Sequence, residues 1–180
     1  YGSFERGGNG KRKKRFLFHD RRNPCVQYYD AESATLVICH GAEKTAAARA
    51  AGHNAFGLLT GEGSAIPPPW LDYFLKKLVP EKIILANDND ETGRRANLET
   101  AQALEDAGFD ASRLFIVRWD ESDAKGRDLN DVLKERGLKG LQEFLDKAPP
   151  YESPRPRALS LGGFITAARP PLRFHIEGIL

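Results

Sequence analysis

Apolar residues in this chain fall into short continuous runs separated by segments with a helical pattern. The runs at 35–39, 55–59, 82–86 and 114–117 are too short for helices and predict buried strands. The segments between and after them predict helices at 43–51, 70–78, 92–107, 129–136 and 141–146. Continuous apolar strands that alternate with helices are typical of a parallel sheet covered on both faces. We therefore expect an α/β fold with about four parallel strands.

The N-terminal region, residues 1–34, differs from this pattern because it is basic and rich in turn-forming residues. Within it, the segments Arg15–Phe18 and Cys25–Tyr29 predict a small β-hairpin that turns at residues 21–24. We expect this hairpin region to precede the α/β core.

The C-terminal region departs from the core pattern as well. The core is expected to span 35–148 and to be followed by a Pro-rich polar linker at 149–158. Residues 159–180 are too few to form a core of their own. Because the chain starts with Tyr1 and stops in an apolar run, we interpret it as a piece of a longer polypeptide, with 159–180 opening the next domain.

Charge is unevenly spread along the chain. The net charge is +2 overall, yet residues 1–30 hold eight Lys and Arg against three Asp and Glu. Such a basic cluster suits the phosphates of a nucleic acid, although a solvated segment has the same composition. The residues of this cluster that we expect to contact phosphates are Lys11, Arg12, Lys13, Lys14, Arg15, Arg21 and Arg22.

The composition argues for a soluble cytoplasmic protein. No run approaches the roughly 18 apolar residues that span a bilayer, and no signal-peptide pattern opens the chain. We expect no membrane contact. Cys25 and Cys39 have no metal-binding spacing and are interpreted as free intracellular thiols, with Cys39 in the core.

The strongest chemical signal follows the third predicted strand, where Asp88 and Asp90 are separated by one residue. Side chains at i and i+2 of an extended chain point the same way, so the two carboxylates are expected side by side. Two such groups repel unless a cation lies between them, and Mg²⁺ favours a few carboxylates together with substrate phosphates. The pattern predicts a divalent-metal site for phosphate chemistry.

Helix capping and a phosphatase motif are the alternatives to a metal site for this pair. Capping of the next helix by Asp88 and Asp90 accounts for one aspartate but not both. The letters Asp-Asn-Asp-Glu-Thr also match the Asp-x-Asp-x-Thr motif of haloacid-dehalogenase-type phosphatases, in which Asp88 is a nucleophile and Asp90 a general acid. That family places its motif on the first strand of the fold, whereas a strand–helix–strand unit precedes it here.

A second motif, Val37-Ile38-Cys39-His40-Gly41-Ala42-Glu43-Lys44-Thr45, places a tight turn and a carboxylate after the first strand. Together with the aspartate strand and Gly93, it resembles the Toprim domain of bacterial-type primases, topoisomerases and some nucleases. The resemblance spans 35–118 and is greatest to phage and plasmid primases. It extends to the segment Arg127-Asp128-Leu129-Asn130-Asp131, since such primases often have Lys-Asp-x-Asn-Asp near that position.

This resemblance implies a Toprim-like, Rossmann-like sheet and a primase activity that depends on Mg²⁺ or Mn²⁺. It implies metal binding by Asp88 and Asp90, with Glu43 or His40 as metal partner or base. Arg94 and Arg95 are expected to contact phosphates. Gly41, Gly93 and Asp128 are expected at the edge of the site, although Asp128 is also a natural helix N-cap. The implied partners are a single-stranded DNA template, nucleoside triphosphates and a fused or associated helicase, because 159–180 resemble the lead-in to a RecA-like domain.

One residue departs from the family pattern. The family has a glutamate at the end of the first strand, whereas this chain has His40, which brings no negative charge to a metal that prefers oxygen. Three alternatives therefore stay open beside a primase: a non-catalytic nucleic-acid-binding module serving a helicase, a Toprim nuclease, and the phosphatase above.

Overall fold

The computed structural model describes residues 3–6, 12–15, 25–29, 33–60, 63, 65–120 and 122–154, with the backbone alone for the first two ranges. The strands of its main sheet are β3 Cys25–Tyr28, β4 Thr35–His40, β5 Asn54–Leu58, β6 Lys82–Leu85 and β7 Leu114–Ile116. They lie in the order β3-β5-β4-β6-β7. Strands β5, β4, β6 and β7 are parallel, and β3 pairs with β5 in the antiparallel sense. The predicted set of four parallel strands is confirmed.

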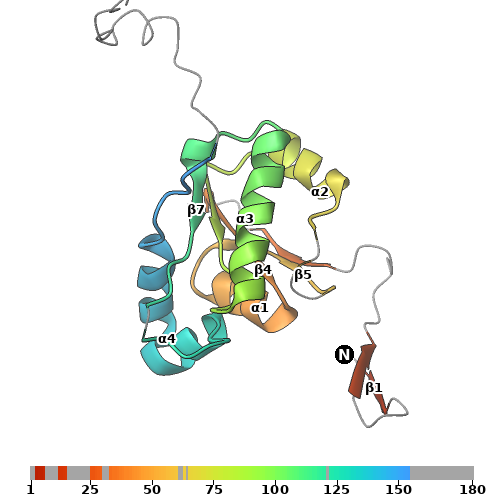
Figure 1. The fold of residues 1–180 in the computed structure, drawn as a ribbon, viewed down its shortest axis with the longest axis vertical. Coiled ribbons are helices and arrows are strands. Elements are labelled where there is room, and N and C mark those ends of the chain that lie inside the picture. The colour runs from red at the N-terminus through yellow and green to blue at the C-terminus, as the bar shows by residue number, and fades with distance from the viewer. Residues whose placement is uncertain are drawn as a thin grey trace, which may run out of the picture.

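Helices cover both faces of this sheet (Figure 1). They are α1 Ala42–Ala50, α2 Pro68–Tyr73, the π-helical segment η1 Phe74–Leu78, α3 Glu91–Asp106, the 3₁₀ turn η2 Ala111–Arg113 and α4 Leu129–Asp146. The two short helices predicted at 129–136 and 141–146 are present as the two parts of α4, which kinks where Gly137 has a φ of 67°. The α/β class is confirmed.

Two hydrophobic cores form because successive residues of each strand face opposite sides of the sheet. On one side, Ile38 and Leu85 pack with Leu104 of α3 and with the aromatic residues of α2 and η1. On the other side, Val37 and Ile84 pack with the alanines of α1 and the leucines of α4. The sheet is therefore buried on both faces, which explains why its strands read as continuous apolar runs.

Cys39, at the end of β4, is part of this buried interior, as expected. Burial raises the pKa of the Cys39 thiol to about 11, so the thiol stays protonated at neutral pH. Cys25 and Cys39 are not joined by a disulfide in the structure.

The N-terminal strands belong to two sheets. A two-stranded antiparallel sheet forms between β1 Ser3–Arg6 and β2 Arg12–Arg15. The segment Cys25–Tyr28 joins the main sheet through β5, a long-range partner that no local pattern reveals. The predicted hairpin between this segment and Arg15–Phe18 falls mostly on residues outside the described ranges and stays a prediction. Residues 16–24 and 155–180, with the last four residues of the predicted linker and the whole predicted following domain, lie outside the described residues.

The carboxyl ends of the parallel strands define the edge where the predicted site lies. His40 ends β4, the two aspartates follow β6, and the first turns of α1, α3 and α4 gather at this edge (Figure 1). In open α/β sheets this edge is where ligands bind. In the part of the chain that the structure describes, no helix combines the length and apolar character needed to cross a bilayer.

Candidate metal and phosphate site

The two predicted metal ligands lie in the turn that links β6 to α3. The Ala86 amide still donates to the Ile38 carbonyl oxygen of β4 at 2.9 Å, so the strand pairing ends there. Asp88 and Asp90 follow in a bend, in which the Asp90 amide donates to the Asp88 carbonyl oxygen at 2.8 Å. The aspartates are therefore neighbours in a turn and not, as the alternation argument assumed, on an extended strand. We call residues 87–90 the acidic turn.

Helix α3 begins directly on the acidic turn. Asp90 is its N-cap, with Oδ1 accepting the Gly93 amide at 2.7 Å. A Cβ added to Gly93 would lie 2.3 Å from the Asp88 carbonyl oxygen. Only a residue without a side chain permits this approach, so the turn requires glycine at this position. Helix capping thus accounts for Asp90 and leaves Asp88 for another role.

Asp88 forms an ion pair with Lys44 of α1 through Oδ1 and Nζ. The pair is largely enclosed, with 12% of the Lys44 side chain and 21% of the Asp88 side chain exposed. Sequence reasoning assigned no role to Lys44. Its position in the first turn of the helix after β4, beside β6 in the sheet, is the signal that places its side chain within reach of the acidic turn.

His40 is buried and is oriented by an amide network beneath the acidic turn. The Asn97 Oδ1 atom accepts the Asn87 backbone amide at 3.2 Å and its side-chain Nδ2 at 2.9 Å. The Asn87 Oδ1 atom therefore faces His40, where it accepts the backbone amide at 2.9 Å and lies 2.8 Å from Nδ1. Because Oδ1 has no proton, the Nδ1 atom of His40 must supply the proton of this hydrogen bond.

The network reaches the segment that follows β7 through Trp119, whose Nε1 donates to the Asn87 carbonyl oxygen at 3.1 Å. The Trp119 ring packs on Phe144 of α4, with ring centroids 4.9 Å apart. Trp119 thus supports the site by packing and hydrogen bonding.

Glu43 lies at the same sheet edge, exposed in the first turn of α1. Gly41 precedes that helix as its N-cap with a φ of 106°, a conformation that favours glycine. An added Cβ at Gly41 would lie 3.2 Å from the Lys44 Cε atom, so the glycine also makes room for the lysine stem.

The loop between β7 and α4 packs on the acidic turn through Asn89, the residue between the aspartates. The Asn89 amide donates to the Arg127 carbonyl oxygen, and the Asn89 carbonyl oxygen accepts the Gly126 amide, both at 2.8 Å. The Asn89 side-chain amide donates to the carbonyl oxygens of Asp123 and Ala124, both at 3.2 Å. We call residues 122–127 the docked loop. Sequence reasoning gave Asn89 no role.

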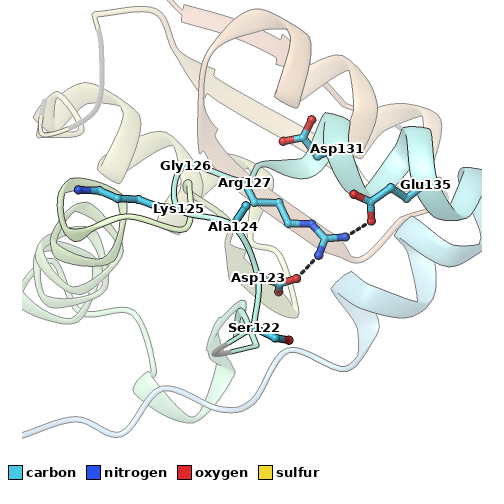
Figure 2. A pocket seen from close by; sticks show the side chains of 8 residues that line it. All are labelled: Ser122, Asp123, Ala124, Lys125, Gly126, Arg127, Asp131 and Glu135. Carbon is cyan, nitrogen blue, oxygen red and sulfur yellow. Dashed lines mark hydrogen bonds and ion pairs between the residues drawn. The ribbon is translucent and has the colours of Figure 1, made fainter.

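The docked loop also lines a pocket of about 310 Å³ (Figure 2). There the Arg127 guanidinium pairs with Asp123 and with Glu135 of α4. Figure 2 shows that Lys125 points away from this group of charges.

Asp128 follows the docked loop and is the N-cap of α4, as predicted. Its Oδ1 atom accepts the Asn130 and Asp131 amides at 2.7 and 3.1 Å, and the Asp131 carboxylate accepts the Asp128 amide at 3.2 Å. This reciprocal arrangement is a capping box. A further role of Asp128 at the edge of the site stays a prediction.

The predicted phosphate-binding residues divide into two groups. Arg94 and Arg95 are exposed in the first part of α3, and the Arg94 Nη1 atom donates to the Asn89 Oδ1 atom at 3.1 Å. In the N-terminal cluster, the structure gives only the backbone of Arg12–Arg15, as strand β2. Lys11, Arg21 and Arg22 lie outside the described residues.

The donor set of the acidic turn fits Mg²⁺ or Mn²⁺. Carboxylate oxygens are the hard ligands that these ions prefer, and Asp88 already holds a cation, the Lys44 ammonium. Within the described ranges, no group of three or more His, Cys, Asp or Glu side chains is arranged to hold a metal ion. Two carboxylates suit an ion whose shell is completed by substrate phosphates and water, and not a closed structural metal centre.

The strand order counts against the phosphatase hypothesis. The strand that leads to the acidic turn, β6, is preceded by β4, α1 and β5, whereas that hypothesis requires the motif on the first strand. The Thr92 position of the proposed motif lies inside the first turn of α3.

A family model described as the Toprim domain matches residues 35–139, which include the acidic turn, His40 and the docked loop. No curated protein sequence matches the chain.

Solved structures of primases have a similar fold. The Aquifex aeolicus primase, in a structure of its zinc-binding and RNA polymerase domains, is 19% identical with a TM-score of 0.52. That match covers 66% of this chain and 27% of the other. The primase fragment of the bacteriophage T7 primase-helicase is 19% identical with a TM-score of 0.45, over 61% of this chain and 43% of the other. The chain thus spans less than half the length of either structure.

Proposed function

Because the chain belongs to the Toprim family, we propose that it is the primase-like part of a DNA replication protein and synthesises primers with Mg²⁺ or Mn²⁺. The observation that carries the proposal is the acidic turn, where Asp88 and Asp90 meet Lys44 and the N-terminus of α3 at the carboxyl edge of the sheet. A pair of carboxylates surrounded by cationic side chains suits a metal that carries nucleotide phosphates.

In this proposal Asp88 and Asp90 hold the metal ion. When bound, the ion neutralises charge on the triphosphate of the incoming nucleotide. Glu43, or the Nε2 atom of His40, accepts the proton of the primer 3′-hydroxyl. Arg94, on the exposed face of α3, contacts the phosphates of nucleotide or template.

The proposed partners are a single-stranded DNA template, nucleoside triphosphates and a fused or associated helicase. The basic residues at 11–15, with Arg21, Arg22 and Arg95, are proposed to contact the template backbone, because each such contact adds salt-dependent affinity. The proposed place of action is the cytoplasm.

The direct test is primer synthesis. We expect the protein, incubated with single-stranded template, the four ribo- or deoxyribonucleoside triphosphates and Mg²⁺, to make short template-dependent products that EDTA abolishes. Labelled products separated by gel electrophoresis measure the reaction. Absence of products over a range of templates and metal ions contradicts the proposal, and DNA cleavage without nucleotides indicates a nuclease instead.

A second candidate is a non-catalytic module that binds nucleic acid for a helicase. The observation in its favour is the end of β4, where His40 stands in place of the family glutamate and is held by Asn87. This candidate predicts binding of single-stranded DNA without primer products, so the same incubation separates the two functions.

The ion pair at Asp88 leads to a separate prediction. Because the Lys44 ammonium competes with a metal for the same carboxylate, Lys44→Gln will raise Mg²⁺ affinity, by on the order of tenfold. Titration calorimetry measures it. The matched control is Lys76→Gln, which removes the exposed partner of Asp72 on α2 and will leave the affinity unchanged. A lower Mg²⁺ affinity in Lys44→Gln than in the wild type contradicts the competition.

A further inference from the structure

Asn89 stands out because its hydrogen-bonding groups join two other parts of the site. It is buried, with 9% of its surface exposed. Its backbone and its side-chain NH₂ hold the docked loop at four points, and its Oδ1 atom accepts Arg94. Asparagine supplies a donor and an acceptor on one short side chain, whereas aspartate lacks the donor. The residue between the two aspartates therefore has a chemical requirement of its own.

The contacts of Asn89 fix where Lys125 lies. Residues 124 and 126, on either side of Lys125, both bond to Asn89, which itself lies between Asp88 and Asp90. The backbone of Lys125 is thus held next to the acidic turn. Its side chain is exposed and about as long as any in proteins, so its ammonium can reach a group bound at that turn.

The charges of the docked loop single out Lys125. Arg127 is engaged with Asp123 and Glu135, so its charge is balanced within the loop and α4. Lys125 points away from that group (Figure 2). Asn89 therefore links two cationic side chains to the acidic turn: Arg94 through a direct hydrogen bond, and Lys125 through the backbone of the docked loop.

We propose that Lys125 binds a phosphate group of the nucleic-acid strand or of the nucleotide, and that Asn89 is the positioning residue that holds Lys125 there. This inference rests on the proposed function, because it assumes that phosphates come to the acidic turn. It adds to that function a cation from the β7–α4 loop and a role for the residue between the aspartates.

The test compares Lys125→Gln with Lys139→Gln, an exposed lysine of α4 beyond the kink. One probe is a fluorescein-labelled oligothymidylate of about 12 nucleotides, bound at several salt concentrations and followed by anisotropy. The other is ATP with Mg²⁺, followed by calorimetry. We expect Lys125→Gln to weaken the binding of one or both probes by about three- to tenfold, and the control variant to change the binding of neither probe.

The two probes identify the source of the phosphate. If Lys125 contacts the strand, the slope of log K against log salt falls by about 0.7 for the oligothymidylate. If it contacts the nucleotide, the loss appears with ATP alone. Lys125→Arg keeps the charge and will restore most of the affinity. Unchanged affinity for both probes, no binding of either by the wild type, or an equal loss in Lys139→Gln overturns the proposal.

The role of Asn89 is tested by measuring the effect of Lys125→Gln both in the wild type and in variants of Asn89. In an Asn89→Ala background the docked loop loses two side-chain contacts, so Lys125→Gln will weaken binding by less than about 1.5-fold. Asn89→Asp is the second variant, because it keeps the acceptor for Arg94 and loses only the side-chain donors. If Lys125→Gln costs the same affinity in these backgrounds as in the wild type, Asn89 does not position Lys125.

These results separate this inference from the proposed function. A wild-type protein that binds the probes in a Lys125-dependent manner but makes no primer contradicts primer synthesis and supports the phosphate contact. If the protein makes primers and Lys125→Gln leaves its affinity for both probes unchanged, primer synthesis is supported and the phosphate contact of Lys125 is contradicted.

Discussion

Replacing both Asp88 and Asp90 by asparagine will lower Mg²⁺ affinity by at least about 100-fold and primer synthesis by at least as much. The change removes two negative charges and leaves the shape of the acidic turn nearly unaltered. Mg²⁺ binds carboxylates far better than neutral amides, because most of its binding energy comes from charge. Calorimetry measures the affinity, and the template-dependent assay measures the synthesis.

Asparagine is chosen because the fold should survive the change. Asn is as good an N-cap as Asp, so the residue that replaces Asp90 can still accept the Gly93 amide and start α3. At position 88 the loss is the partly buried pair with Lys44. Asp72→Asn, in an exposed ion pair on α2, is the control for the chemical change alone. Mg²⁺ affinity equal to that of the wild type in the double variant would show that the acidic turn is not the metal site.

Replacing Gly93 by alanine will destabilise the protein by about 3 kcal/mol, although the same change inside a helix usually stabilises by about 1 kcal/mol. The new Cβ would lie 2.3 Å from the Asp88 carbonyl oxygen and 2.8 Å from its amide nitrogen. Both are backbone atoms, so the acidic turn itself must move. Denaturant unfolding measures the stability, and we expect Mg²⁺ affinity to fall with it.

Gly137→Ala provides the contrast for Gly93→Ala. Gly137 has a φ of 67° at the kink of α4, and an added Cβ there would meet no atom within 4 Å. That variant carries the cost of a backbone conformation that is nearly restricted to glycine, about 1–3 kcal/mol, without a steric clash, and will leave Mg²⁺ affinity unchanged. A Gly93→Ala protein as stable as the wild type would mean that α3 does not need this close approach.

Much of the core follows from local pattern. The runs that contain Ile38 and Ile84 are apolar at every position because both faces of the sheet are covered, and such runs are short enough to be recognised as strands. The kink in α4 was also predictable, since Gly137 separates two segments that each have a helical pattern. The helix cap at Asp128 follows from its position just before an apolar segment.

The pairing of β3 was not predictable in the same way. A strand such as Cys25–Tyr28 carries no local sign that β5 is its partner, and the nearby segment Arg15–Phe18 suggests a hairpin. Strand β5 lies between β3 and β4, and it pairs with β3 in the antiparallel sense and with β4 in the parallel sense. Pairings of this kind depend on topology, which a single sequence reveals poorly.

The residues of the site divide in the same way, into those that a local pattern reveals and those whose roles depend on the fold. Asp88 and Asp90 were identified because two carboxylates at a strand end repel each other unless a cation lies nearby. Asn87 and Asn89 alternate with them and were assigned no role, because an isolated asparagine in a turn is common. Their roles depend on His40, Asn97 and the docked loop, which the fold brings from elsewhere in the chain.

The ion pair between Lys44 and Asp88 bears on whether the domain needs a metal ion in order to fold. In many small metalloproteins the ion is the counter-charge without which the chain does not fold. Here the chain supplies that counter-charge from α1. We therefore expect the domain to fold without a metal ion, so that the ion proposed for the acidic turn can bind afterwards, together with the phosphates of a nucleotide.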